Sequence, residues 1–115
     1  MSDRHPIVIA PAKGTVTVRW RGRQVAQSTR ALELREASYP AVLYLPREDA
    51  DMAWFEPTAH ATTCPYKGVA SYYSLAGEGA RDANAVWTYE TPNAGVEAIK
   101  GHLAFYADKV EIERG

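Results

Sequence analysis

The feature that most constrains this chain is a pattern of short segments in which apolar and polar residues alternate. The clearest example covers residues 15–20, where every second residue is Val or Trp. Alternation with a period of two places the apolar side chains on one face of a β-strand. Similar runs recur along the chain, separated by prolines and by turn signals such as Arg21-Gly22. The sequence therefore predicts a mainly β fold of short antiparallel strands.

Further strands are predicted wherever this alternation, or a short apolar run, continues. They cover residues 24–28, 31–36, 42–45, 62–63, 69–75, 86–89, 102–106 and 110–113. Residues 31–36 also have some helical propensity, but their period of two favours a strand. Residues 77–84 are rich in glycine and polar side chains, so we expect a loop there.

One or two short helices are expected between the strands. Residues 50–55 can form one helical turn with Asp49 as its cap. Residues 93–100 fit a short helix that Asn93 caps and Gly101 ends. Residues 1–13 are predicted to be an N-terminal arm, whose Ile7-Val8-Ile9 run either lies along a sheet edge or stays mobile. Residues 14–115 then form one small domain.

Composition narrows the classes of partner. The 115 residues carry 13 basic and 14 acidic side chains, so no strongly basic surface is expected to attract nucleic acid or an anionic membrane. No apolar run approaches the ~20 residues that span a bilayer. Prolines interrupt the first apolar run, which argues against a signal peptide. We expect a cytoplasmic, soluble protein that is a monomer or a homodimer.

The single cysteine limits metal and redox chemistry. Cys64 has no partner for an internal disulfide. A chain with one cysteine also cannot form a four-cysteine zinc site. The histidines (His5, His60 and His102) show no spacing typical of metal ligands. We therefore predict neither a metal nor a cofactor, and the low cysteine content fits a reducing compartment.

The stretch from Cys64 to Gly68, Cys-Pro-Tyr-Lys-Gly, is predicted to be a turn between two strands. A glutaredoxin-type dithiol motif would need a second thiol where Lys67 stands, so dithiol redox chemistry is rejected. Cys64 is either a small buried apolar residue or a thiol whose reactive form the ammonium of Lys67 favours. Lys67 itself is either solvated at a hairpin tip or holds a carboxylate or phosphate group.

A series of blocks in this order resembles the DUF427 family. The blocks are Glu36, Tyr44–Asp49, Cys64–Tyr73, Val86–Tyr89 with Pro92, and Ile99–Tyr106. The resemblance runs from about Val16 to Ile112, and it implies a small, mostly bacterial, single-domain protein of unknown function. It also implies an all-β fold of the β-tent, barrel-like type, similar to the Mss4-like folds. Many Mss4-like proteins hold zinc with two cysteine pairs, and the lone Cys64 implies that such a site is absent here.

We expect a pocket around the Cys64–Gly68 turn that binds a small polar or anionic ligand. The candidate lining residues are Glu36, Tyr44, Arg47, Asp49, Cys64, Lys67, Tyr72 and Trp87. Lys67 and Arg47 would neutralise ligand charge, and Glu36 and Asp49 would orient its polar groups. The aromatic side chains would stack on the ligand, although aromatics at strand spacing also serve as core residues.

Two other classes of function remain open. The chain could be an enzyme in which Cys64 is the nucleophile, while Lys67 activates it and a carboxylate or His60 moves protons. It could instead be a protein-interaction module whose sheet edges pair with a partner.

Overall fold

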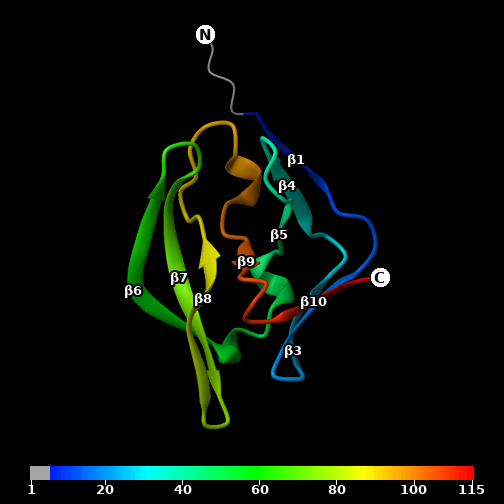
Figure 1. The fold of residues 1–115 in the computed structure, drawn as a ribbon, viewed down its shortest axis with the longest axis vertical. Helices are drawn as coiled ribbons and strands as arrows, with labels where there is room; N and C mark the ends of the chain where they lie inside the picture. Colours follow the sequence, from blue (N-terminus) through cyan, green and yellow to red (C-terminus); the bar gives the residue numbers. More distant parts are fainter. Residues whose placement is uncertain (1–5) are drawn as a thin grey trace.

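The computed structural model describes residues 6–115 and folds them into three antiparallel sheets (Figure 1). The strand orders are β1-β4-β5, β10-β2-β3 and β6-β7-β8-β9. The strands are β1 (Ile7–Pro11), β2 (Val16–Trp20), β3 (Arg23–Ser28), β4 (Leu32–Glu36), β5 (Val42–Tyr44), β6 (Phe55–Cys64), β7 (Gly68–Gly77), β8 (Ala80–Thr88), β9 (Leu103–Phe105) and β10 (Glu111–Arg114). The predicted mainly β, antiparallel fold is confirmed.

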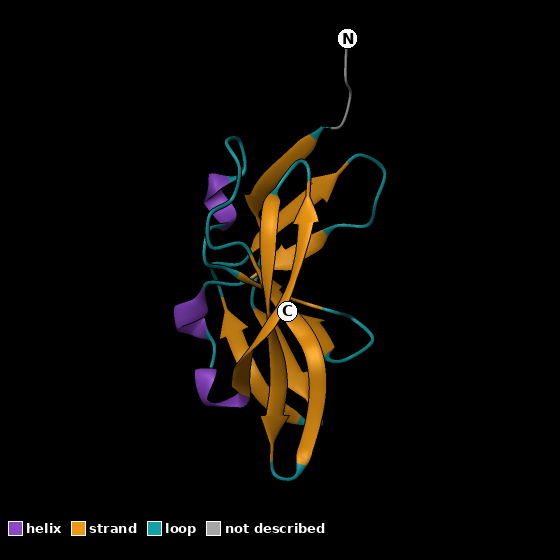
Figure 2. Cartoon of the chain, turned by 90° about the vertical axis from the view of Figure 1, so that its left-hand side faces the viewer, coloured by secondary structure: helices purple, strands orange, loops and turns teal. Residues whose placement is uncertain are grey.

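Helical structure in residues 6–115 is limited to single 3-10 turns, which lie on one side of the strands (Figure 2). They are η1 (Arg47–Asp49), η2 (Met52–Trp54) and η3 (Glu97–Ile99). None of them is long or apolar enough to cross a membrane.

The two helix predictions need correction. The helix expected at residues 93–100 shrinks to η3, because Gly95 has a φ of +94°, which a right-handed helix cannot contain. The turn expected at residues 50–55 is η2, but its cap is Asp51, whose carboxylate accepts a hydrogen bond of 3.3 Å from the Ala53 N–H. Asp49 instead ends η1.

The loop predicted at residues 77–84 is also wrong. Only Glu78 and Gly79 form the turn, with φ values of +52° and +79°, and the chain then enters β8 at Ala80. The burial of β8 alternates between exposed and half-buried positions in this stretch, so its polar residues belong to a strand at the margin of the core. β6 is likewise much longer than the predicted Thr62-Thr63 strand. It tolerates Pro57 because it lies at a sheet edge.

Part of the expected N-terminal arm is an edge strand. β1 pairs with β4 in the register Ile9 with Leu34. Positions 1–5, which include His5, lie outside the described residues.

The core consists of two clusters of buried side chains. The larger one is centred on Trp20, Leu45, Leu75, Val86 and Phe105. The second contains Leu34, Tyr44, Ala70, Tyr72, Tyr89, Val96, Ile99 and Ala104. The second cluster joins the β4–β5 pair to the β7–β8 hairpin, and its tyrosines bring polar hydroxyl groups into an otherwise apolar interior.

Candidate functional site

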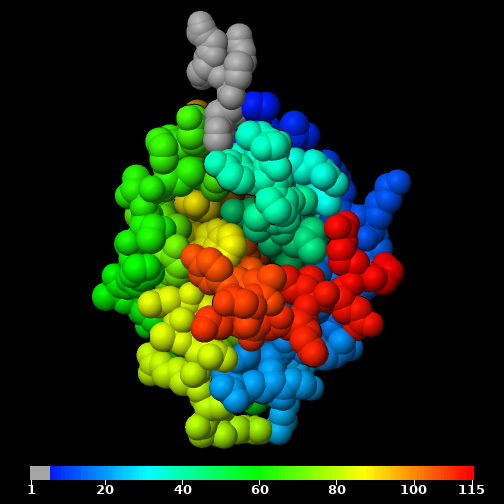
Figure 3. Space-filling model, viewed as in Figure 1, coloured from blue at the N-terminus to red at the C-terminus, as the bar shows by residue number. Residues whose placement is uncertain are grey.

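A cavity of about 230 Å³ opens beside this second cluster. Its walls come from β4, β5, β7 and β8 and from the β6–β7 turn. The lining residues are Leu34, Glu36, Val42, Tyr44, Lys67, Tyr72, Trp87, Tyr89 and Tyr106. Figure 3 shows a hollow on this face between the green β6–β7 hairpin, the cyan-to-teal β4–β5 pair and the orange segment around β9. Yellow atoms of β8 lie recessed within that hollow.

The charged groups of the cavity form a close ion pair. Lys67 Nζ lies 2.5 Å from Glu36 Oε1, and the two side chains are only 11% and 17% exposed. Lys67 comes from the β6–β7 turn and Glu36 from the end of β4, which Figure 1 shows at the same end of the molecule. The pair therefore connects two sheets and leaves the lining with no net charge from these two groups.

Backbone contacts hold the turn that carries Lys67. Cys64 pairs with Gly68, which has a φ of +112° that side-chain-bearing residues rarely adopt. The Asn93 N–H donates to the Lys67 carbonyl at 2.9 Å, and the Asn93 side-chain amide donates to the Pro65 carbonyl at 3.3 Å. The segment after β8 thus fixes the β6–β7 turn, which favours a preformed site.

A chain of hydroxyl groups lies along one wall. The Tyr72 hydroxyl is 2.9 Å from Thr62 Oγ1 and 3.3 Å from the Tyr106 hydroxyl. The hydrogen bond to Tyr72, together with desolvation, raises the pKa of Tyr106 to about 12. Tyr106 is therefore neutral at physiological pH, and its hydroxyl can exchange hydrogen bonds with a ligand.

Trp87 forms a second wall. Its Nε1–H donates to the Tyr44 hydroxyl at 3.3 Å, and its ring lies 4.6 Å from the ring of Tyr106 between their centroids. Trp87 and Tyr106 remain partly accessible, so their rings offer a surface on which a planar molecule can stack.

Tyr89 and Tyr44 present hydroxyl groups that the described residues do not fully use. Tyr89 is 5% exposed and its hydroxyl makes no hydrogen bond with any residue from 6 to 115. Tyr44 is 1% exposed and accepts from Trp87, while its own O–H finds no acceptor in the same part of the chain. Desolvation by burial raises the pKa of both phenols, so both remain hydrogen-bond donors.

Cys64 and Lys67 are in contact. Desolvation lowers the pKa of Lys67, but the hydrogen bond to Glu36 and the interactions with Cys64 outweigh it, and the net shift is upward. Lys67 is therefore a cation at neutral pH and a poor nucleophile. Cys64 is half-buried and does not line the cavity itself.

His60 and His102, the two histidines within residues 6–115, do not join Cys64 in a catalytic arrangement. The His60 ring lies 4.5 Å from the Tyr72 ring between centroids, and His102 Nδ1 lies 3.0 Å from the Lys100 carbonyl. No cluster of three or more His, Cys, Asp or Glu within the described range could hold a metal ion.

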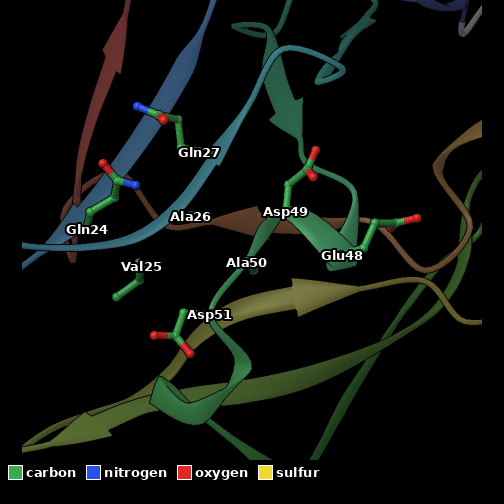
Figure 4. Close-up of a pocket in the computed structure, with 8 residues that line it drawn as sticks. All are labelled: Gln24, Val25, Ala26, Gln27, Glu48, Asp49, Ala50 and Asp51. Atoms are coloured by element: carbon green, nitrogen blue, oxygen red, sulfur yellow. The ribbon is translucent and has the colours of Figure 1, made fainter.

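Arg47 and Asp49 lie away from this cavity. Arg47 contacts Thr88 and pairs with Glu90 at 2.7 Å. The Asp49 carboxylate accepts from Ser28 at 2.6 Å and pairs with Arg30, and these contacts lower the pKa of Asp49, with Ser28 contributing most. Figure 4 shows Asp49 in a different, open depression between β3 and the η1–η2 segment.

Of the eight predicted site residues, five line the cavity: Glu36, Tyr44, Lys67, Tyr72 and Trp87. Tyr89 and Tyr106 line the cavity as well. The strand spacing of Tyr89 with Tyr72 and Trp87 already made Tyr89 a possible cleft residue, whereas sequence reasoning missed Tyr106. Tyr89 lies one residue beyond β8 and two positions after Trp87, and both side chains line the cavity. Tyr106 ends the Ile99–Tyr106 block, and it lies one residue beyond β9.

The fold and the cavity define a small, antiparallel β domain with one ion pair and several tyrosines at a partly enclosed site. The chain belongs to the DUF427 family, described as a domain of unknown function, whose model matches residues 8–115. No curated protein matches the sequence.

Proposed function

We propose that this domain binds a small, neutral, planar molecule that carries an oxygen acceptor, such as an aromatic amide. The observation that carries the proposal is that Lys67, Glu36 and the tyrosine hydroxyls converge on one cavity. Ligand pockets typically combine apolar and aromatic walls with a few placed polar groups, and this cavity has that composition.

Charge favours a neutral polar ligand over an anionic one, although the sequence allows both. Lys67 is already paired with Glu36, and Arg47 is paired with Glu90 outside the cavity. A carboxylate that enters beside Glu36 would meet a like charge where solvent screening is weak. A neutral acceptor avoids this repulsion and keeps the ion pair intact.

Hydrogen-bond donors favour an oxygen acceptor. The O–H groups of Tyr44 and Tyr89 have no acceptor among residues 6–115. Lys67 donates one of its three N–H groups to Glu36, so it can also donate to a ligand. A carbonyl oxygen accepts two hydrogen bonds, and an amide nitrogen can donate to Glu36 or to Tyr72.

The size of the cavity favours a single ring as the bound group. Drug-sized ligands occupy pockets of roughly 300–1,000 Å³, and this cavity is about 230 Å³. Trp87 would then stack on one face of the ring, and Tyr106, which is tilted by 50° to Trp87, would contact its edge.

The test compares benzamide with benzoate, because these probes have nearly the same shape and differ in charge. We expect saturable benzamide binding with a Kd of about 1 mM, as for a ligand of this size, and at least about tenfold weaker benzoate binding. Calorimetry gives the affinities, and nuclear magnetic resonance shifts at Tyr72 and Trp87 locate the site. Tighter binding of benzoate, or no saturable binding of either probe, would contradict the proposal.

A second candidate function is thiol chemistry at Cys64. The contact between Cys64 and Lys67 favours it, because it places the thiol beside the cation of the cavity. The rate of alkylation by iodoacetamide, measured from pH 6 to 9, tests the idea. If Cys64 reacts with iodoacetamide only after the protein unfolds, this second function is ruled out.

A further inference from the structure

We infer that the ligand of this domain is amphipathic, with a polar ring in the Glu36–Lys67 cavity and an apolar chain in an adjoining groove. This inference rests on the proposed function and specifies its ligand class further. It is carried by a second depression that shares part of its lining with the cavity.

The adjoining groove has a volume of about 250 Å³. Its lining residues are Ala41, Val42, Leu43, Trp87, Phe105, Tyr106, Ala107 and Ile112. Val42, Trp87 and Tyr106 belong to both sites, so the two spaces meet along these three side chains. A molecule that stacks on Trp87 in the cavity therefore lies next to the groove.

The groove differs from the cavity in chemistry. The residues that line the groove alone carry no side-chain nitrogen or oxygen atom: Ala41, Leu43, Phe105, Ala107 and Ile112. The cavity, in contrast, contains the ion pair and the tyrosine hydroxyls. One side of the shared border thus suits a polar head and the other suits a hydrocarbon chain.

Two exposed side chains at and beside the border between the cavity and the groove support an apolar chain that lies across them. Tyr106 is 41% exposed and Ile112 is 36% exposed, although both have large, mainly apolar side chains. Removing such apolar surface from water is favourable. The groove continues the cavity along Val42, Trp87 and Tyr106, and its volume of about 250 Å³ fits a chain of a few carbons.

The experiment compares benzamide with 4-propylbenzamide by calorimetry. Each methylene that leaves water strengthens binding by about fourfold, so we expect 4-propylbenzamide to bind at least about tenfold more tightly than benzamide. The shifts that the propyl group adds in nuclear magnetic resonance spectra should fall on Ala41, Leu43 and Ala107.

A pair of variants at Ile112 provides the control, because this residue lines the groove and not the cavity. Ile112→Glu should remove the gain from the propyl group, whereas Ile112→Val should keep most of it. Both variants should bind benzamide like the original protein, which also shows that they are folded.

The two failures can be distinguished. If benzamide binds but the propyl group adds less than twofold, or if Ile112→Glu leaves the gain intact, the amphipathic ligand is ruled out while the proposed function stands. If neither probe binds saturably, the proposed function fails and this inference fails with it.

Discussion

Lys67 Nζ lies 2.5 Å from Glu36 Oε1, and this contact joins the turn between β6 and β7 to the end of β4. The two residues belong to different parts of the fold and are 31 positions apart in the sequence. Because both side chains are mostly buried, the pair contributes to the shape of the cavity as well as to its charge.

The first prediction concerns the strength of this pair. Lys67→Met should lower the free energy of unfolding by about 1–3 kcal/mol, because it leaves a largely buried carboxylate without its cation. The double variant Lys67→Met/Glu36→Gln should be less destabilised than the sum of its single variants, with a coupling energy of about 1–2 kcal/mol. Urea unfolding of the four proteins gives this cycle.

The exposed pair of Arg23 and Glu78 is the matched control for that cycle. Its side chains are 53% and 58% exposed, so Arg23→Met should change stability by less than about 1 kcal/mol. Additive effects of Lys67→Met and Glu36→Gln would show that the two side chains do not depend on each other.

The second prediction is alkaline destabilisation. The folded state raises the pKa of Lys67 and of Tyr44, Tyr89 and Tyr106, the last to about 12. Above a pH of about 10, the unfolded chain releases protons that the folded chain still holds. Stability should therefore be constant through neutral pH and fall as the pH rises from about 10 toward the folded-state values.

Urea unfolding from pH 7 to 11.5 measures this loss. Ultraviolet titration of the seven tyrosines should show a group that ionises late, together with unfolding. Stability that rises between pH 10 and 11.5, or tyrosines that all titrate together near pH 10, would contradict the burial described here.

The third prediction concerns the turn at Gly68. A Cβ atom there would lie 3.3 Å from Asn93 Oδ1 and 3.4 Å from the Thr91 carbonyl oxygen, at a φ of +112°. Gly68→Ala should cost about 1–3 kcal/mol of stability. Gly79→Ala, at a φ of +79° with no atom within 4 Å of the new carbon, should cost less, about 1 kcal/mol. Thermal unfolding compares the two, and equal losses would argue against the close packing of Asn93 on the turn.

The fourth prediction separates binding from stability at Tyr89. Its hydroxyl has no hydrogen-bond partner in residues 6–115, so Tyr89→Phe should not lower the melting temperature. The same variant should weaken benzamide binding by about three- to tenfold, the value of one hydrogen bond. Tyr73→Phe is the control, since Tyr73 lies on β7 beside Tyr72 but packs on Phe55 in the larger core cluster. A loss of stability without a loss of binding would make Tyr89 a structural residue.

Much of the fold follows from local periodicity. The alternation at residues 15–20 predicts β2 because a half-buried strand needs it. Periodicity does not predict most of β6 or the start of β8, because these segments are largely exposed and their polar residues resemble those of a loop. Pro57 also interrupts the pattern of β6, and only its place at a sheet edge makes it compatible with a strand.

The candidate site depends on contacts that local patterns do not contain. Lys67 and Glu36 meet because β4 and the β6–β7 turn lie at one end of the molecule, which is a property of the topology. Arg47 lies near the predicted residues in the sequence but is held by Glu90 elsewhere. Residue type could therefore suggest which groups carry chemistry, while the arrangement of the sheets decides which of them face one cavity.

The most direct test of the central claim is a crystal structure of the protein soaked with benzamide. We predict a ring stacked on Trp87 and an amide oxygen within hydrogen-bond distance of the Tyr44 or Tyr89 hydroxyl, with the Lys67–Glu36 pair intact. A cavity that stays free of benzamide at saturating concentration, or benzamide bound only elsewhere on the surface, would contradict the account.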